Sequence, residues 1–366
     1  MRPRANTARL NARLLCCTLA LLDLAGCVRI AEHRYKADPA KEASRLVPVQ
    51  VRTELETIVR GGVPGVTAIA MRNGRELFRL DVGDIGPDTQ YPVASASKWM
   101  AAALVMTVVD EGKLALDESI SNVLPGFRGA AGRITLRQLL SQTSGVGSLK
   151  SRVDARQDPR ITLAQSAAEI AQRPLEDPPG RVFKYGGPGF QVAGALVEEV
   201  TGERWAELFE ERIAKPLGMT RTYWAHLPGN GISPAHTRNP LLQGGVVTTA
   251  DDYMRFLTMV AQRGVFNGYR ILSEESVETM ETAQTLGIRM AYLPPGATPG
   301  MEYALGNWCE RWSADGRCSL VSSPGALGTY PWIDRKSGVY GIFFLRDRYS
   351  RVAERLGRAR SAIIGN

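Results

Sequence analysis

The chain has 366 residues, of which 44% are hydrophobic and 22% charged, and its formal net charge is +8. This length allows one large domain or two ordinary ones, and the composition excludes a disordered, collagen-like, coiled-coil or polytopic membrane protein. Arginines are scattered among carboxylates without a long run of like charge, so the positive excess does not predict a nucleic-acid partner.

The N-terminal segment has the organisation of a signal peptide. Four arginines within the first thirteen residues precede an apolar run, Leu14 to Leu22, which is too short to cross a bilayer as a helix. The sequence Leu24-Ala25-Gly26-Cys27 then resembles the bacterial lipobox, where cleavage leaves a cysteine that receives lipid. The alternatives are an ordinary secreted chain cut nearby and a membrane anchor that is not cleaved.

These features predict a lipoprotein signal peptide over residues 1–26 and a polar tether over 27–47. We therefore expect an exported bacterial lipoprotein that faces the periplasm and is held at the membrane by a lipid on Cys27. The next residue is Val28 rather than an aspartate, which favours the outer membrane. The sequence does not predict an oligomeric state.

A single folded domain is expected over residues 48–366. Apolar spacing predicts helices at 49–59, 97–109, 135–141, 163–171, 191–200, 205–213 and 350–362. Strands are predicted at 66–71 and 77–82, joined at Asn73-Gly74, and again at 319–323, 330–334 and 339–345.

This order of elements predicts one antiparallel sheet made from both ends of the chain, flanked by helices, with a helical domain inserted between its two parts. The fold class is α/β (α+β). The sheet lobe would comprise about 48–115 and 246–366, and the helical lobe about 116–245. A functional site is expected where the two lobes meet.

The strongest chemical signal is Ser95-Ala96-Ser97-Lys98 at the start of the apolar helix. A serine and a lysine three residues apart share one face of a helix, and burial favours the neutral amine, which can take a proton from the hydroxyl. With 20 serines and 8 lysines in the chain, chance alone gives about 0.4 such pairs, and this one is the only match. The alternative is an incidental surface serine and lysine.

Two further features bear on the site. Tyr185 lies in a glycine-rich stretch between two predicted helices, where its phenol could share a proton with a lysine; the alternative is a tyrosine that packs in a loop. Cys309 and Cys318 bracket a polar turn, which in an exported protein predicts a disulfide, with two free thiols as the alternative. Cys16 and Cys17 lie in the predicted signal peptide, so the folded body keeps only Cys309 and Cys318, and the whole chain has three histidines; no metal or cofactor is expected.

Together with 134–145 and 244–252, these motifs resemble the serine β-lactamase and penicillin-binding-protein superfamily. The likeness is greatest to the branch related to class C β-lactamases, which also holds D-alanyl-D-alanine peptidases and esterases. It runs from about residue 50 to 350. The resemblance implies a β-lactamase/transpeptidase-like fold, and catalysis by Ser95, Lys98 and Tyr185.

The second and third motifs depart from the family pattern. Gly187 stands where asparagine is usual, and Ser323-Pro324-Gly325 replaces a Lys-Thr-Gly or His-x-Gly that lies on the sheet edge in the family. The resemblance implies that these four residues contact substrate and that the backbone N–H groups of Ser95 and Ala326 form an oxyanion hole. A serine in place of a cation weakens recognition of a substrate carboxylate.

The sequence therefore predicts a serine hydrolase that works through an acyl-enzyme, most simply an esterase acting on a small or neutral acyl substrate. A peptidoglycan D,D-peptidase or a β-lactamase is the alternative within the same mechanism. From a different class, the altered motifs also suit a catalytically inactive protein that binds cell-wall peptides or a partner in the envelope. A structural lipoprotein with an incidental Ser95 and Lys98 is a third, weaker interpretation.

Overall fold

A computed structural model describes residues 47–147, 158–226 and 233–365. The predicted signal peptide, Cys27 and all of the tether except its last residue lie outside the described residues. Among those that are described, no helix has both the length and the apolar character needed to cross a membrane.

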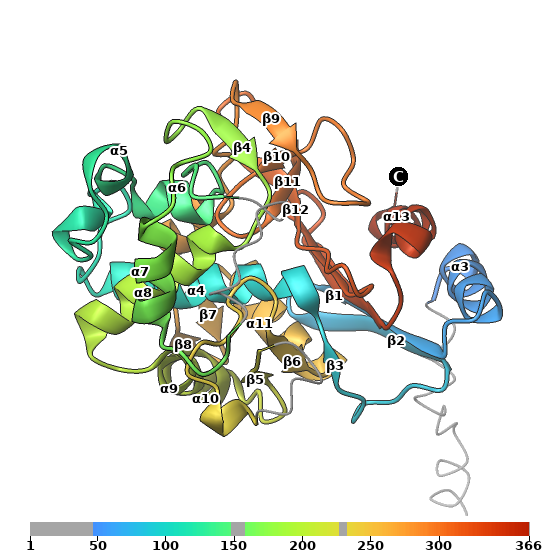
Figure 1. Cartoon of the computed structure of the whole chain (residues 1–366). Coiled ribbons are helices and arrows are strands. Elements are labelled where there is room, and N and C mark those ends of the chain that lie inside the picture. The colour runs from blue at the N-terminus through green and yellow to red at the C-terminus, as the bar shows by residue number, and fades with distance from the viewer. Residues whose placement is uncertain (1–46, 148–157, 227–232, 366) are drawn as a thin grey trace, which may run out of the picture. The chain divides into compact units, whose positions relative to one another are not determined.

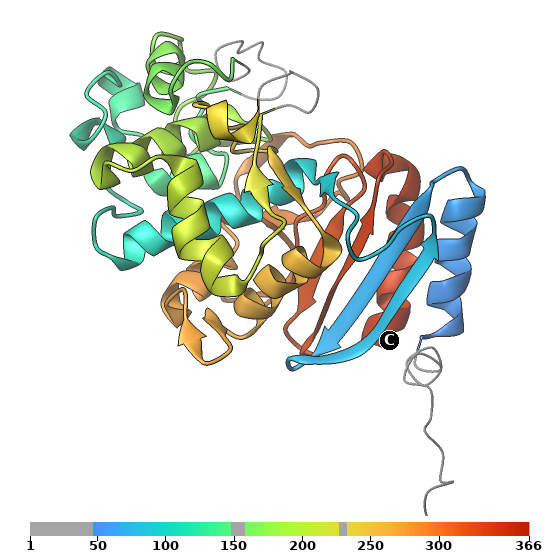
Figure 2. The same cartoon turned by 90° about the horizontal axis from the view of Figure 1, so that it is seen from below.

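The centre of the domain is a seven-stranded antiparallel sheet (Figures 1 and 2). Its strands lie in the order β10 (Glu302–Tyr303), β11 (Trp308–Trp312), β12 (Cys318–Ser322), β13 (Tyr330–Asp334), β14 (Val339–Leu345), β1 (Gly65–Arg72) and β2 (Arg75–Gly83). β1 from the start of the domain pairs with β14 near its end, which confirms the predicted sheet built from both ends of the chain. Asn73 and Gly74 have φ angles of 49° and 81°, which suit the two-residue turn between β1 and β2.

Two helices from the ends of the domain cover one face of the sheet. α3 (Val49–Arg60) and α13 (Tyr349–Ile364) lie side by side there (Figure 1). Their buried residues, including Leu55 and Leu356, form one hydrophobic cluster with side chains of β1, β13 and β14. Apolar periodicity predicts both helices because only one face of each is buried.

A larger hydrophobic cluster joins the other face of the sheet to the remaining helices. These are α4 (Ser97–Asp110), α5 (Gly129–Gly132), α6 (Leu136–Leu140), α7 (Leu163–Ala171), α8 (Pro188–Thr201), α9 (Trp205–Phe209), α10 (Lys215–Leu217), α11 (Ala250–Ala261) and α12 (Glu274–Met280). All of α4 from Ser97 to Val108 is buried. A helix enclosed on every side explains why its sequence is apolar without a polar face.

Three small sheets complete the described structure: β3 (Tyr91–Pro92) with β6 (Val246–Thr248) and β5 (Tyr223–Trp224), β4 (Val182–Lys184) with β9 (Arg289–Tyr292), and β7 (Val265–Phe266) with β8 (Tyr269–Arg270). The first of them leads directly into the start of α4, and the second supports the segment that carries Tyr185. Both therefore position residues singled out in the sequence.

The resemblance implies that the third motif lies on a sheet edge, and this expectation is wrong. β12 is an interior strand, paired with β11 on one side and β13 on the other, and it ends at Ser322. Ser323, Pro324 and Gly325 follow it in the connection to β13. Pro324 is tolerated because it lies beyond the strand, where no ladder hydrogen bond needs its missing N–H.

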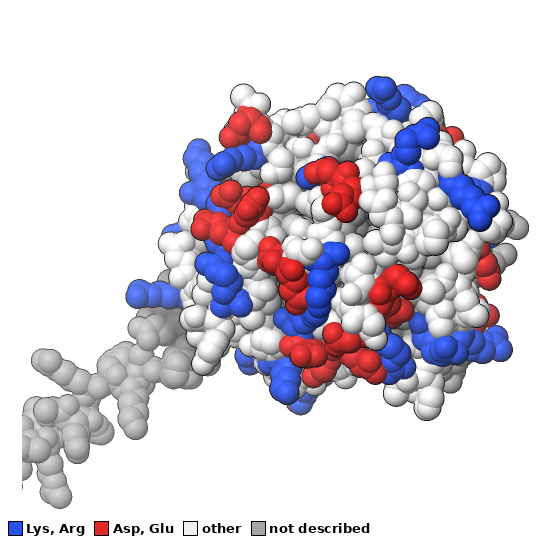
Figure 3. All heavy atoms as spheres, turned by 90° about the vertical axis from the view of Figure 1, so that its left-hand side faces the viewer, with Lys and Arg blue, Asp and Glu red and all other residues white. Residues whose placement is uncertain are grey.

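Charges of both signs are interspersed on the face shown in Figure 3.

Where α3 meets α13, the Glu54 carboxylate accepts hydrogen bonds from Arg358 at 2.6 and 3.1 Å and from Arg355 at 2.9 Å. The Arg358 hydrogen bond is the main cause that lowers the pKa of Glu54 below its usual value of 4.5; burial opposes it, and Arg355 adds to it. The charged form of Glu54 is thus favoured in the folded state.

Replacing Glu54 with glutamine should lower the free energy of unfolding at pH 7 by about 1–2 kcal/mol, because the two arginines lose a charged acceptor. A folded-state pKa below the unfolded value contributes stability above the unfolded pKa and loses it as pH falls through the folded pKa. The difference between wild type and variant should therefore be constant from pH 5 to 8 and shrink in acid. Urea unfolding at several pH values measures it.

Glu354→Gln is the matched control, since the Glu354 side chain is 90% exposed and pairs only with Arg358 among the described ion pairs. It should cost less than about 0.5 kcal/mol. Equal losses in both variants would show that Glu54 does not join the two helices electrostatically.

Candidate active site

Ser95 lies in a single turn of 3-10 helix, Ala94–Ala96, between β3 and α4. Ala94 has a φ of 46°, a left-handed conformation that a residue with a side chain rarely adopts. Such strain is retained where the surrounding structure enforces it, and here it turns the chain sharply so that Ser95 faces a pocket.

The turn is fixed by hydrogen bonds from two distant elements. The Ser97 hydroxyl accepts from the N–H of Val246 in β6 at 3.0 Å, and the Tyr253 hydroxyl of α11 donates to the carbonyl of Ala96 at 2.7 Å. Ser97 and Tyr253 are fully buried. The backbone around Ser95 is thus held before any substrate binds.

Lys98 is the second residue of α4 and is only 1% exposed. Its Nζ donates to the Ser95 Oγ at 3.1 Å and to the main-chain carbonyl of Gln243 at 2.9 Å. It also lies 4.5 Å from the centroid of the Tyr185 ring and 5.8 Å from that of Phe190. The pair predicted from spacing is therefore in contact, with the lysine enclosed and the serine open to the pocket.

Tyr185 belongs to a buried aromatic cluster with Phe183, Tyr303 and Trp308. Its ring stacks on Trp308 at a centroid distance of 5.6 Å, and its N–H donates to the carbonyl of Tyr292 at 3.0 Å. Burial raises the pKa of Tyr185, and a hydrogen bond with Ser95 offsets this only in part. The phenol is consequently neutral at physiological pH and suited to relay or donate a proton.

Ser95 and Ala326 both line the pocket. Neither of their backbone N–H groups has a hydrogen-bond acceptor among the residues that the structure describes. The Ala326 carbonyl accepts from the N–H of Tyr349 at 3.0 Å, which fixes its peptide, and Gly325 lies so close to Val93 that a Cβ there would be 2.0 Å from the Val93 carbonyl oxygen. The loop after β12 is therefore packed directly against the turn that carries Ser95.

The resemblance implies that Ser323 and Gly325 contact substrate, but neither is among the residues that line the pocket. Ser323 is 3% exposed, and its hydroxyl lies 3.3 Å from the carbonyl oxygen of Gly306 and 3.5 Å from that of Ser95. Ser323 lies just beyond the end of β12, and its side chain is buried. Pro324 lines the pocket as expected.

Gly187, whose expected role is also a substrate contact, is likewise not among the residues that line the pocket. The carboxamide of Gln243 fills the space beside it, so that a Cβ at 187 would lie 0.8 Å from the Gln243 Oε1. The sequence analysis does not single out Gln243, although this residue directly precedes the 244–252 motif. Its side chain carries the kind of amide that residue 187 lacks.

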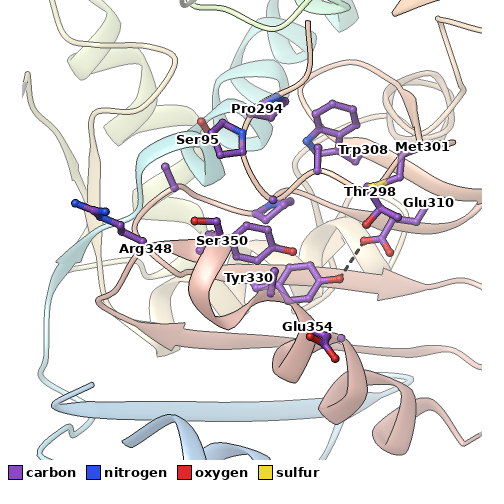
Figure 4. A pocket seen from close by; sticks show the side chains of 18 of the residues that line it. Ser95, Pro294, Thr298, Met301, Trp308, Glu310, Tyr330, Arg348, Ser350 and Glu354 are labelled. Carbon is purple, nitrogen blue, oxygen red and sulfur yellow. Dashed lines mark hydrogen bonds between the residues drawn. The ribbon is translucent and has the colours of Figure 1, made fainter. Parts of the chain in front are cut away.

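The pocket at Ser95 has a volume of about 690 Å³ and is bounded by the 294–301 segment, β13 and the start of α13 (Figure 4). Most of its lining is apolar or aromatic: Pro294, Pro295, Met301, Trp308, Tyr330 and Tyr349. Figure 4 shows Arg348 at one end and Glu310 at the other. A cavity of this size suits a small-molecule substrate.

A disulfide joins Cys309 in β11 to Cys318 in β12, with their Cα atoms 5.4 Å apart. Cys309 lies between Trp308 and Glu310, two residues of the pocket wall. The crosslink therefore fixes the part of the sheet that borders the site. No cluster of metal-ligating side chains occurs in the described parts of the chain.

The model of the β-lactamase family matches residues 43–364. This chain belongs to the β-lactamase family. Its relatives within the serine β-lactamase and penicillin-binding-protein superfamily include "Penicillin-binding protein 4" of Amycolatopsis lactamdurans, 31% identical over 218 residues. That alignment covers 53% of this chain and 56% of the relative, so the chain matches little more than half the relative's length.

Solved structures agree with the family assignment. A candidate β-lactamase from Bacteroides dorei DSM 17855 is 34% identical to this chain, with a TM-score of 0.72. The aligned region covers 82% of this chain and 95% of the Bacteroides chain. EstCE1, described as a hydrolase with promiscuous acyltransferase activity, shares the fold at 21% identity, with a TM-score of 0.73. The aligned region covers 88% of this chain and the whole EstCE1 chain. The β-lactamase/transpeptidase-like fold predicted from the sequence is thus confirmed.

Replacing Lys98 with methionine keeps the side chain's bulk and removes its amine. If Lys98 activates Ser95, ester hydrolysis should fall by about 10²–10⁴-fold, the usual contribution of a general base. Steady-state kinetics on a p-nitrophenyl ester measure the loss.

Lys113→Met is the matched control, because Lys113 is exposed and pairs with Glu111. Its activity should stay within twofold of wild type. A Lys98→Met variant that folds normally and keeps its activity would contradict the assignment.

Proposed function

We propose that this protein is an esterase-like serine hydrolase that acts on neutral acyl substrates. The observation that carries the proposal is the hydrogen bond between the buried Lys98 Nζ and the Ser95 Oγ, at the wall of a largely apolar pocket. EstCE1, which shares the fold, is a hydrolase.

In the proposed reaction, the Ser95 Oγ attacks the substrate carbonyl carbon while the neutral Lys98 amine takes the serine proton. The tetrahedral oxyanion accepts hydrogen bonds from the N–H groups of Ser95 and Ala326. As the intermediate collapses, the bond to the leaving group breaks and the leaving group takes the proton. Water then attacks the acyl-enzyme and loses a proton to the same base. As the bond between the acyl carbon and the Ser95 Oγ breaks, the base returns that proton to Oγ, which releases the acid and regenerates Ser95 and the neutral amine.

Tyr185 assists as a neutral phenol in this scheme. Burial raises its pKa, so it does not act as a phenolate base. Its hydrogen bond with Ser95 and the position of its ring beside Lys98 allow it to pass a proton between the site and the leaving group. Lys98 is therefore the primary base.

The character of the pocket favours a neutral substrate. Its charged lining residues are Glu310, Arg348, Glu354 and Arg360, of which Arg360 pairs with Glu310 at 2.7 Å and Glu354 with Arg358. A paired charge offers little to a substrate carboxylate, and Ser323 is turned away from the pocket. An ester with an apolar acyl or alcohol group matches the remaining surface.

A second candidate, a D,D-peptidase or β-lactamase, is favoured by Arg348. Among the described residues, this exposed pocket-lining guanidinium has no carboxylate within ion-pair distance. It could hold the carboxylate of a cell-wall peptide or a β-lactam in place of the cation that the third motif lacks. The penicillin-binding protein among the relatives is consistent with this candidate.

We also propose that the chain is exported and anchored by a lipid on Cys27, facing the periplasm from the outer membrane. Its support is the arginine-rich start, the short apolar run and Leu24-Ala25-Gly26-Cys27. A disulfide between Cys309 and Cys318 is typical of an oxidising compartment.

Incubation of the purified protein with a fluorescent fluorophosphonate and, separately, with a fluorescent penicillin tests the proposed activity. We expect the fluorophosphonate to label Ser95, located by mass spectrometry, and the penicillin to label weakly or not at all. Ser95→Ala is the control and should lose all labelling. Strong penicillin labelling favours the second candidate, and no labelling by either probe leaves an inactive binding protein.

Replacing Arg348 with alanine separates the two candidates. If the substrate is neutral, turnover of a p-nitrophenyl ester should stay within twofold of wild type. If Arg348 holds a carboxylate, acylation by penicillin should fall about five- to tenfold, the effect of one partly exposed charged hydrogen bond. Arg346→Ala is the control, since Arg346 is also exposed but does not line the pocket.

A further inference from the structure

The side chain of Gln243 occupies the space that a side chain at position 187 would need. The φ of Gly187 is −125°, which any residue can adopt, so its backbone does not require glycine. The obstacle is steric, because a Cβ at 187 would lie 0.8 Å from the Oε1, 1.8 Å from the Cδ and 2.4 Å from the Nε2 of Gln243. The carboxamide of Gln243 thus takes the place of a side chain at 187.

The segment that carries Gln243 is firmly held. The Gln191 Oε1 of α8 accepts from the N–H of Leu242 at 2.8 Å, and its Nε2 donates to the Pro240 carbonyl at 3.1 Å. Gln191 is fully buried, and Gln243 is 8% exposed. The backbone next to Gln243 is therefore held by the buried core of the domain.

The backbone carbonyl of Gln243 contacts Lys98. Its carbonyl accepts from the Lys98 Nζ at 2.9 Å, and the same Nζ donates to the Ser95 Oγ. Gly187, over which the carboxamide lies, is two residues beyond Tyr185. Gln243 therefore lies between Lys98 and the segment that carries Tyr185.

The carboxamide is also left with an unused acceptor. Its Oε1 is buried without a hydrogen-bond partner among the residues that the structure describes. A buried polar atom without a partner is costly in a folded protein, and such atoms gather at sites where a ligand or water supplies the missing bond. An apolar side chain would fill this space without that cost.

We propose that Gln243 is a positioning residue of this site: its carbonyl orients Lys98, and its carboxamide supplies the polar group that residue 187 lacks. The inference rests on the proposed hydrolase function. It makes Gly187 and Gln243 a matched pair, in which either position but not both can carry the amide.

The steric part is tested without any measurement of activity. Gly187→Asn alone should lower Tm by roughly 2–6 °C, because the new side chain is forced against the carboxamide. In the Gln243→Ala background, the same substitution should cost less than half of that shift. Additive Tm changes in the double variant would show that the two positions do not compete for one space.

The functional part uses the same variants in the full chain, with a p-nitrophenyl ester as the probe. Gln243→Ala should lower kcat about 10- to 100-fold with KM within threefold of wild type, and Gly187→Asn/Gln243→Ala should regain at least a third of the wild-type kcat. Gln262→Ala is the matched control, since Gln262 is exposed and lies beside Gly74. It should leave kcat unchanged.

Gln243→Glu adds a readout that a purely structural role does not move. A carboxylate near Lys98 stabilises the charged lysine, so the acid limb of the kcat/KM profile should shift upward by about one pH unit. Unchanged kcat and an unchanged pH profile in folded Gln243 variants would overturn the inference.

Failure of the inference and of the hydrolase proposal can be told apart. If wild-type protein neither turns over the ester nor reacts with the fluorophosphonate, the hydrolase proposal fails and the positioning role fails with it. If wild type is active and Gln243→Ala is equally active and equally labelled, only the positioning role is lost.

Discussion

The burial of Lys98 is the constraint around which the rest of the site is arranged. An amine enclosed at the start of an apolar helix is costly unless it is hydrogen bonded or neutral. Two of its bonds come from Ser95 and from the main chain of Gln243, and two aromatic rings cover it. The same enclosure keeps the Lys98 amine out of solvent and against the Ser95 hydroxyl.

Other features follow from the need to hold that lysine beside a strained serine. α4 is buried on all sides, so its start cannot shift, and Tyr253 and Val246 fix the turn before it from two further elements. The loop after β12 approaches this turn as closely as Gly325 allows. The sheet therefore serves mainly as a frame that brings one loop, with the N–H of Ala326, to the serine.

The sequence predicts those parts of the site that depend on local spacing or on long regular patterns. Ser95 and Lys98 are three residues apart, and the strands at 330–334 and 339–345 are continuous apolar runs, so these predictions agree with the structure. The helix α11 was not among the predicted helices, although Thr249 caps it in the usual way.

Long-range geometry accounts for the rest. The resemblance implies that Ser323 faces substrate, whereas its hydroxyl is buried against the carbonyl of Gly306, a residue 17 positions away in the chain. The contact of Gln243 with Gly187 joins two segments far apart in sequence, so no local sequence pattern predicts it. The same holds for the pocket wall formed by the 294–301 segment and α13, which meet only in the folded chain.

The pairing of β1 with β14 has a consequence for how the chain folds. Val66 lies opposite Leu345, so the central sheet joins the first strand of the domain to its last. Contacts of such high sequence separation form slowly, since a loop of nearly the whole domain must close first. Until β14 forms, the edge of β1 that pairs with it has no partner in the central sheet, so the β1–β2 hairpin can be built into the sheet only late in folding.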